Sequence, residues 1–191
     1  MSADVPVKPE FSRLVAVEDI DSGLERTISA RPEELKALAR RMKLPAIRLL
    51  SATLRVTPEG RGGYMVRGHL RAEVEQECVR TLEIFPATVE ADIERLFVPP
   101  DSPAARALDA APTVELDMDA PDAPDIISEG HIDLGELVAE YLALALDPWP
   151  KKPGTDFMDM EAAAPETARR EEPDEEHPFA ALRQLKKEDR S

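Results

Sequence analysis

Hydrophobic and polar positions alternate along much of the first hundred residues. The clearest case is the stretch 64–78, where apolar and charged side chains alternate. One face would carry Val66, Gly68, Leu70, Ala72, Val74 and Cys78, and the other would carry Arg67, His69, Arg71, Glu73, Glu75 and Glu77. A period of two is typical of a β-strand with one buried face and one wet face.

Four further stretches predict strands. Two of them are short and rich in β-branched or apolar residues, and the turn-like DIDSG separates them. The third is joined to 64–78 by PEGRGG, which suits a hairpin, and the fourth stops at Pro99 and Pro100. In chain order these strands are residues 11–17, 25–30, 46–57 and 82–98. We therefore expect an antiparallel sheet of about five to six strands.

Two segments repeat apolar residues at helical spacing. The early one has Pro32 in its first turn and ends before Pro45. The late one follows Asp133, a good N-cap residue, with Glu136 at the capping-box position, and Pro148 ends it. Its apolar stripe consists of Leu134, Leu137, Val138, Tyr141, Leu142 and Ala145. One early and one late helix beside a sheet predict an α+β fold.

Two acidic stretches lack the large apolar residues that a core needs. We expect 101–125 to be a flexible loop within a single α+β domain at 8–150, and 151–177 to be a disordered linker. The last segment, 178–187, is short and amphipathic. Its apolar residues at i, i+3 and i+6 are Phe179, Leu182 and Leu185, which predicts a docking motif on a tether.

Charge is distributed unevenly along the chain. The formal net charge is -15, yet residues 1–100 hold 15 basic and 16 acidic side chains, whereas 101–191 hold 9 and 23. Within the first half, 31–55 carries a local excess of +5. The candidate RNA contacts in this basic patch are Lys36, Arg40, Arg41, Lys43 and Arg48. The same residues could instead form a solubilising surface, and with 4% aromatic residues there is no sign of a base-stacking platform.

The sequence offers little catalytic chemistry. It contains no GxGxxG, GKS/T phosphate loop, GxSxG or HExxH pattern. The three histidines have no metal spacing, and we interpret His69, His131 and His177 as surface or capping residues. Glu136 and Glu140 lie four apart on one helix face and could act as a carboxylate pair, but capping and solvation explain them better. We therefore expect a protein that acts by binding, without enzymatic activity, cofactor or small-molecule substrate.

Cysteine content and hydropathy indicate where the protein works. A single cysteine, Cys78, cannot close an internal disulfide or build a zinc site alone, and its place on the apolar face predicts a small buried hydrophobe. No run of about 18 apolar residues exists, and the first residues lack the layout of a secretory signal. We expect a cytoplasmic protein of a bacterial or organellar interior that has no membrane partner.

Three segments together resemble a known family. They are VRGHLRAEVEQECVRTLEIFPATVEADIERLF, GHIDLGELVAEYLALALDPWPKKPG and HPFAALRQLK. They are similar to the YceD family, the large ribosomal RNA subunit accumulation proteins, in the form typical of alphaproteobacteria. The residues that carry the resemblance include Cys78, Arg80, Asp133, Gly135, Glu136, Glu140 and Pro148.

The resemblance implies a role in ribosome biogenesis, through synthesis, processing or accumulation of large-subunit (23S) ribosomal RNA, without a known catalytic activity. Many relatives carry Cys-x-Arg-Cys and a later cysteine cluster, which together suggest zinc. Here Thr81 replaces the second cysteine, and KKPG stands where the later cluster would begin. The zinc is therefore not carried over to this chain.

Two binding mechanisms and two other roles stay open. The basic patch could contact ribosomal RNA, or the acidic loop and tail could hold a basic large-subunit ribosomal protein or an assembly factor, which we favour slightly. The rivals are a carboxylate-dependent RNA-processing enzyme built on Asp133, Glu136 and Glu140, and a general acidic adaptor unrelated to ribosomal RNA.

Overall fold

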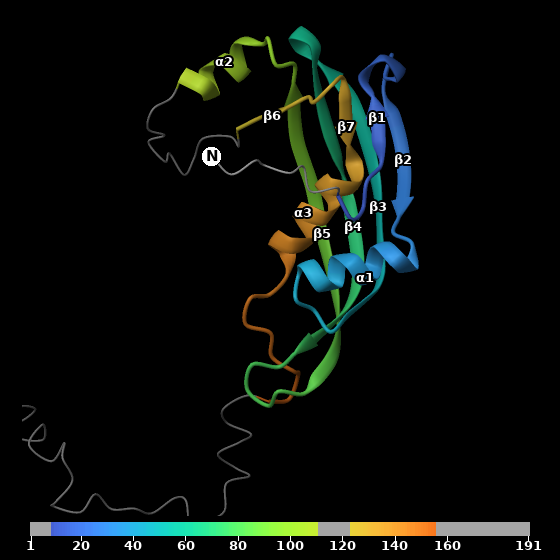
Figure 1. Ribbon diagram of the computed structural model, residues 1–191, viewed down its shortest axis with the longest axis vertical. Coiled ribbons are helices and arrows are strands. Elements are labelled where there is room, and N and C mark those ends of the chain that lie inside the picture. Colours follow the sequence, from blue (N-terminus) through green and yellow to red (C-terminus); the bar gives the residue numbers. More distant parts are fainter. Residues whose placement is uncertain (1–8, 111–122, 156–191) are drawn as a thin grey trace, which may run out of the picture. The chain divides into compact units, whose positions relative to one another are not determined.

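A five-stranded sheet forms the centre of the computed structural model, which describes residues 9–110 and 123–155 (Figure 1). In spatial order its strands are β2 (Leu24–Ser29), β3 (Ala46–Glu59), β4 (Gly63–Glu77), β5 (Ile84–Val98) and β6 (Asp125–Ile126). Neighbouring strands are antiparallel except β5 and β6, which run parallel. The largely antiparallel α+β fold expected from the sequence is confirmed.

A second sheet has two strands and shares the core of the first. It pairs β1 (Leu14–Ala16) with β7 (His131–Asp133), residues far apart in the sequence. The sequence predicted a strand at 11–17 in the main sheet, but β1 joins β7 instead. The Val17 N–H donates to the Gly130 carbonyl (3.0 Å) and continues this pairing.

Both predicted helices are present. They are α1 (Pro32–Arg41) and α3 (Leu134–Ala145), and both cross the same face of the main sheet (Figure 1). Single 3-10 turns occupy Val17–Asp19 and Gly60–Gly62. The helices bury the apolar face of the sheet, where the largest fully buried side chains include Leu38, Leu50, Leu54, Leu70, Ile93 and Leu142. Burial of each such side chain stabilises the fold by about 1.5–3 kcal/mol.

The alternation predicted for β4 is confirmed, and it separates two faces. Val66, Leu70 and Val74 are buried, whereas Arg67 and His69 are exposed. Gly68 has a structural reason, because a Cβ atom there would collide with the Thr53 carbonyl and with Leu54 on β3. The opposite face is wet and carries cross-strand ion pairs, which join Arg55 to Glu25, Arg67 to Glu94, and Arg71 to Glu90.

One helix lies where the sequence predicted only a flexible loop. Helix α2 spans Pro103–Ala110, inside the stretch 101–125. The Ser102 hydroxyl accepts the Ala105 N–H (3.1 Å) and caps the first turn, Pro103 suits its first position, and Ala105 is buried. Local capping and small residues are thus enough for a short helix in a segment that is poor in large apolar side chains.

The chain divides into two units, residues 1–151 and 152–191. Every helix and strand of the described residues belongs to the first unit. Of the second, residues 152–155 are described, and there the Thr155 N–H donates to the Lys152 carbonyl (3.3 Å) in a turn. The predicted linker at 151–177 and the predicted amphipathic segment at 178–187 lie almost wholly outside the described residues.

Candidate functional site

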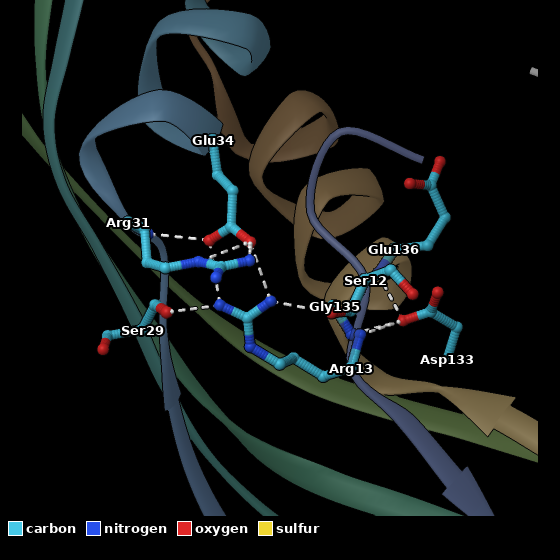
Figure 2. Close-up of polar contacts among 8 residues, drawn as sticks. All are labelled: Ser12, Arg13, Ser29, Arg31, Glu34, Asp133, Gly135 and Glu136. Atoms are coloured by element: carbon cyan, nitrogen blue, oxygen red, sulfur yellow. Dashed lines mark hydrogen bonds and ion pairs between the residues drawn. The ribbon is translucent and has the colours of Figure 1, made fainter. Parts of the chain in front are cut away.

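A half-buried group of charges joins the N-terminal segment to α1 (Figure 2). We call Arg13, Arg31 and Glu34 the Arg13 cluster. Arg13 Nη1 and Nη2 donate to the two carboxylate oxygens of Glu34 (2.9 and 2.8 Å), and Arg31 Nη2 donates to Oε1 (2.7 Å). Glu34 is only 8% exposed. The hydrogen bonds from Arg13, and then those from Arg31, hold the pKa of Glu34 well below its usual range despite its burial.

The same N-terminal segment closes the start of α3. One carboxylate oxygen of Asp133 accepts the N–H groups of Arg13 (2.7 Å), Gly135 (2.9 Å) and Glu136 (3.2 Å), as Figure 2 shows. A Cβ atom at Gly135 would lie 2.6 Å from the Phe11 carbonyl oxygen, so only glycine fits. The predicted N-cap role of Asp133 is confirmed, and two residues of the family motif thus have a structural explanation.

The capping-box prediction for Glu136 is wrong. Its Oε1 atom accepts a hydrogen bond from Arg41 (2.9 Å), which also donates to Glu10 (3.0 Å). Its Oε2 atom is buried without a hydrogen-bond partner among the described residues. A charged guanidinium at the end of α1 is a stronger partner for this carboxylate than a neutral backbone N–H.

The basic patch lies on α1 and the start of β3, as expected, but carboxylates engage much of it. Arg41 binds Glu136 and Glu10, and Arg48 Nη2 lies 2.6 Å from Glu75 Oε1. Lys36 Nζ lies 4.0 Å from Glu33 Oε1. Within the described part of the chain, Arg40 and Lys43 form no such ion pair. The cations of the patch that remain for a phosphate are therefore few.

An acidic pocket of about 350 Å³ lies beside α3. We call it the α3 pocket; its lining includes Asp125, Glu136 and Glu140 together with Leu14, Phe97, His131 and Leu137. Partial burial raises the pKa of Glu140, and the negative charges of Asp125 and Glu136 raise it further, against the opposing effect of Arg95 and Arg41. Asp125 and Glu136 pair with Arg95 and Arg41, whereas Glu140 forms no ion pair within the described residues.

The connection from β4 to β5 meets the segment that follows α3. The Val79 N–H donates to the Pro150 carbonyl (3.0 Å), close to the exposed Pro148. This hydrogen bond places Cys78 and Arg80, the two neighbours of Val79 in the chain, close to the segment that follows α3. Cys78 is fully buried, as predicted, but Thr81 and Lys151 are not zinc ligands. The side chains at this end of the sheet do not fit a zinc ion.

The other candidate residues are not brought together into a catalytic arrangement. His69 is exposed and its Nδ1 lies 3.0 Å from Asp92, while His131 Nδ1 lies 2.8 Å from the Glu129 carbonyl. Over residues 9–110 and 123–155, no group of three or more His, Cys, Asp and Glu side chains is arranged to hold a metal ion. Nor is any described helix long and apolar enough to cross a membrane. His177 and the predicted docking residues Phe179, Leu182 and Leu185 lie outside the described residues.

Two features escaped the sequence analysis. Arg13 was not singled out, because nothing in FSRLVAV signals that its partner stands about twenty residues later at Glu34. The pairing of β5 was also missed: β4 pairs with it from Ile84 to Phe97, whereas on its other side the described residues pair β6 only with Phe97 and Val98. The alternation in 82–98 predicts a strand and says nothing about its neighbours. The only sequence signal for Arg13 is that it is a single charged residue within an apolar run.

The fold and its surface define an α+β domain with an acidic pocket beside its late helix. A model of the family described as "Large ribosomal RNA subunit accumulation protein YceD" matches residues 66–186, which is more than half of the chain. The chain therefore belongs to the YceD family, as the resemblance suggested. No curated protein and no solved structure is detectably similar to it.

Proposed function

We propose that this protein supports the accumulation of 23S ribosomal RNA in the cytoplasm by binding a basic protein of the assembling large subunit, without catalysing a reaction. The family description gives the coarser role in large-subunit ribosomal RNA accumulation. The observation that carries the finer proposal is Glu140 of the α3 pocket, whose pKa is raised by burial and by neighbouring carboxylates. A lysine or arginine side chain from a partner would relieve this repulsion.

Electrostatics favour a basic protein over RNA as the direct partner. Phosphate binding gains most of its free energy when cations release counterions. Arg41 and Arg48 already have carboxylate partners at 2.9 and 2.6 Å, so binding RNA would require them to exchange one anion for another. The acidic residues of 101–191 would add repulsion, whereas they would attract a basic protein and speed its association.

RNA contact stays as the second candidate, and it rests on Arg40 and Lys43. Arg40 lies in the last turn of α1 and Lys43 follows the C-cap residue of that helix, and no carboxylate of the described chain pairs with either cation. If they bind RNA, affinity should fall steeply with salt, and the double change Arg40→Ala/Lys43→Ala should reduce that slope by about two.

The positions of the candidate carboxylates give less support to the hypothesis of an RNA-processing enzyme. Asp133 uses one oxygen to cap α3, and Glu136 is paired with Arg41. Activation of water would need carboxylates that can reach a substrate or an ion. Cleavage of ribosomal RNA by the purified protein, lost in the Glu136→Ala/Glu140→Ala variant, would replace our proposal with this one.

The decisive experiment mixes the purified full-length chain with proteins extracted from isolated large subunits, and separately with purified 23S ribosomal RNA. We expect a basic large-subunit protein to bind after ribonuclease treatment and the RNA not to bind at physiological salt. In cells, deletion of the gene should lower the ratio of large to small subunits on a sucrose gradient. An unchanged ratio under slow growth and in the cold would contradict the role in accumulation.

A further inference from the structure

One edge of the main sheet is open over most of its length. Strand β5 pairs with β4 from Ile84 to Phe97, whereas on its other side β6 pairs only with Phe97 and Val98 among the described residues. The described residues therefore leave the outer edge of β5 without a partner strand from Ile84 to Leu96. Open strand edges present N–H and C=O groups that another chain can pair with.

The backbone groups that face this edge can be identified. The Glu94 carbonyl accepts the Tyr141 hydroxyl (2.5 Å), and the Val98 carbonyl accepts the Ile127 N–H (2.9 Å), both on the side away from β4. Every second residue of a strand points its backbone groups to the same side. Thr88, Glu90 and Asp92 therefore present their N–H and C=O groups to the open edge.

Acidic side chains border the edge on both faces of the sheet. On the wet face lies a column that we call the acid rim, formed by Glu90, Asp92 and Glu94, all exposed. On the helix face lie Asp125 and Glu140, next to Arg95 and Tyr141. The helix face of β5 also carries apolar side chains that are half-buried, namely Ala87, Val89 and Ala91.

These features select the strand that could pair here. A second copy of β5 in antiparallel register would set its acid rim against the first, and like charges on adjacent strands destabilise a sheet. An RNA would meet exposed carboxylates and a row of amides at this edge, and the nearby Arg67 and Arg71 are already paired with those carboxylates. A peptide that alternates basic and apolar residues fits, because its cations would lie beside the acid rim and its apolar side chains beside Val89 and Ala91.

We infer that the open edge of β5 from Thr88 to Glu94 binds an extended, lysine- and arginine-rich segment of a partner protein as an added strand. This inference rests on the proposed function, because the partner is the basic large-subunit protein proposed above. It adds the location, the extended conformation and the alternating pattern of the bound segment. The cations of that segment would share the carboxylates that now face Arg71, His69 and Arg67.

The first test uses the full-length chain and a short capped peptide in which lysine alternates with valine. A peptide in which glutamate replaces each lysine is the control. On binding of the lysine peptide, amide hydrogen exchange should slow at Thr88, Glu90 and Asp92, the residues whose N–H groups face the edge. Binding without slower exchange at these three amides, or equal binding of the glutamate peptide, would overturn the inference.

The second test compares matched charge reversals. Glu94→Lys and Glu25→Lys each break one exposed cross-strand pair with an arginine on the same face (2.9 and 2.8 Å), but Glu25 lies on the opposite edge strand. We expect Glu90→Lys/Asp92→Lys to weaken binding of the lysine peptide at least about tenfold, Glu94→Lys to weaken it less, and Glu25→Lys to leave it unchanged. An equal effect of Glu94→Lys and Glu25→Lys would contradict a site at β5.

A third variant tests the backbone itself. Glu90→Pro removes an N–H that faces the open edge and leaves the bonds to β4 in place, so binding should be lost while the melting temperature falls only slightly. If this variant does not fold, the charge reversals decide. If the large-subunit protein binds the wild type and every variant equally, the edge is refuted while the proposed function stands. If it does not bind the wild type at all, the proposed function fails as well.

Discussion

Charged residues hold the N-terminal segment against α1, and charged residues also line the open edge of β5. The central carboxylate is buried in the first region, whereas the carboxylates are exposed in the second. Around Arg13, each charge has a nearby partner, Glu34 is buried, and the backbone comes too close for any side chain at Gly135. Along β5, the acid rim also faces Arg71, His69 and Arg67 on β4, but these pairs are exposed, and the edge-facing amides have no partner strand in the described part of the chain.

This difference in burial separates residues that stabilise the fold from residues that the fold does not require. Asp133 and Gly135 are among the residues on which the family resemblance was based, yet their contacts are internal and explain them as parts of the structure. Glu140 is another of those residues, but it is exposed and its charge is unfavourable where it stands. Residues whose charge the fold does not need are the better candidates for function.

Gly135→Ala should have the largest effect on stability. The new Cβ atom would lie 2.6 Å from the Phe11 carbonyl oxygen and 2.9 Å from the Arg13 nitrogen, both backbone atoms that cannot move aside easily. We expect a loss of about 2–4 kcal/mol in the free energy of unfolding, measured by urea titration. Gly60→Ala is the matched control, because nothing lies within 4 Å of its Cβ position, and it should change stability by less than about 0.5 kcal/mol.

Glu34→Gln should cost about 2–3 kcal/mol at pH 7, because it leaves the Arg13 guanidinium without its anion. The depressed pKa of Glu34 also fixes a pH dependence. Its contribution is complete above the unfolded pKa of about 4.3 and is lost as the pH falls toward the lower folded pKa. The wild type should therefore lose more stability than the variant between pH 5 and acid conditions in parallel urea titrations. Parallel curves for the two proteins would contradict this assignment.

Glu140→Gln should have a small effect of the opposite sign. Because the pKa of Glu140 is raised in the folded state, its ionised form opposes folding, and the wild type gains stability as the pH falls through that pKa. Removing the charge should raise the free energy of unfolding at pH 7 by no more than a few tenths of a kcal/mol, since most of the side chain lies in water. The same change should weaken binding of the basic partner. Lower stability together with unchanged binding would assign Glu140 to the fold instead.

Removal of metal ions by a chelator should not change the stability of the protein. Cys78, Thr81 and Lys151 do not supply the ligands of a zinc site, so treatment with a strong chelator should leave the melting temperature unchanged. Elemental analysis of the purified protein should find no stoichiometric zinc. One tightly held zinc per chain would show that residues outside the described part complete a site.

Local sequence patterns were enough to predict the helices and strands that depend on neighbouring residues. The period-two pattern of 64–78 fixed β4 and its buried face, because alternate residues of a strand must point to opposite sides. Pro32 and Asp133 fixed the starts of α1 and α3, since helix initiation depends on side chains within one turn. Helix α2 was missed because its weak local signals stand in an acidic segment without a large apolar stripe.

The contacts between residues far apart in the chain depend on how the helices and strands pack. Arg13 forms an ion pair with Glu34, Arg41 forms one with Glu136, and β1 pairs with β7 instead of joining the main sheet. Only the sheet order shows that the described residues leave one side of β5 largely unpaired, so no residue pattern could have revealed the edge. Sequence patterns record what each residue needs from its own helix or strand, whereas ion pairs and open edges depend on how those elements are placed in space.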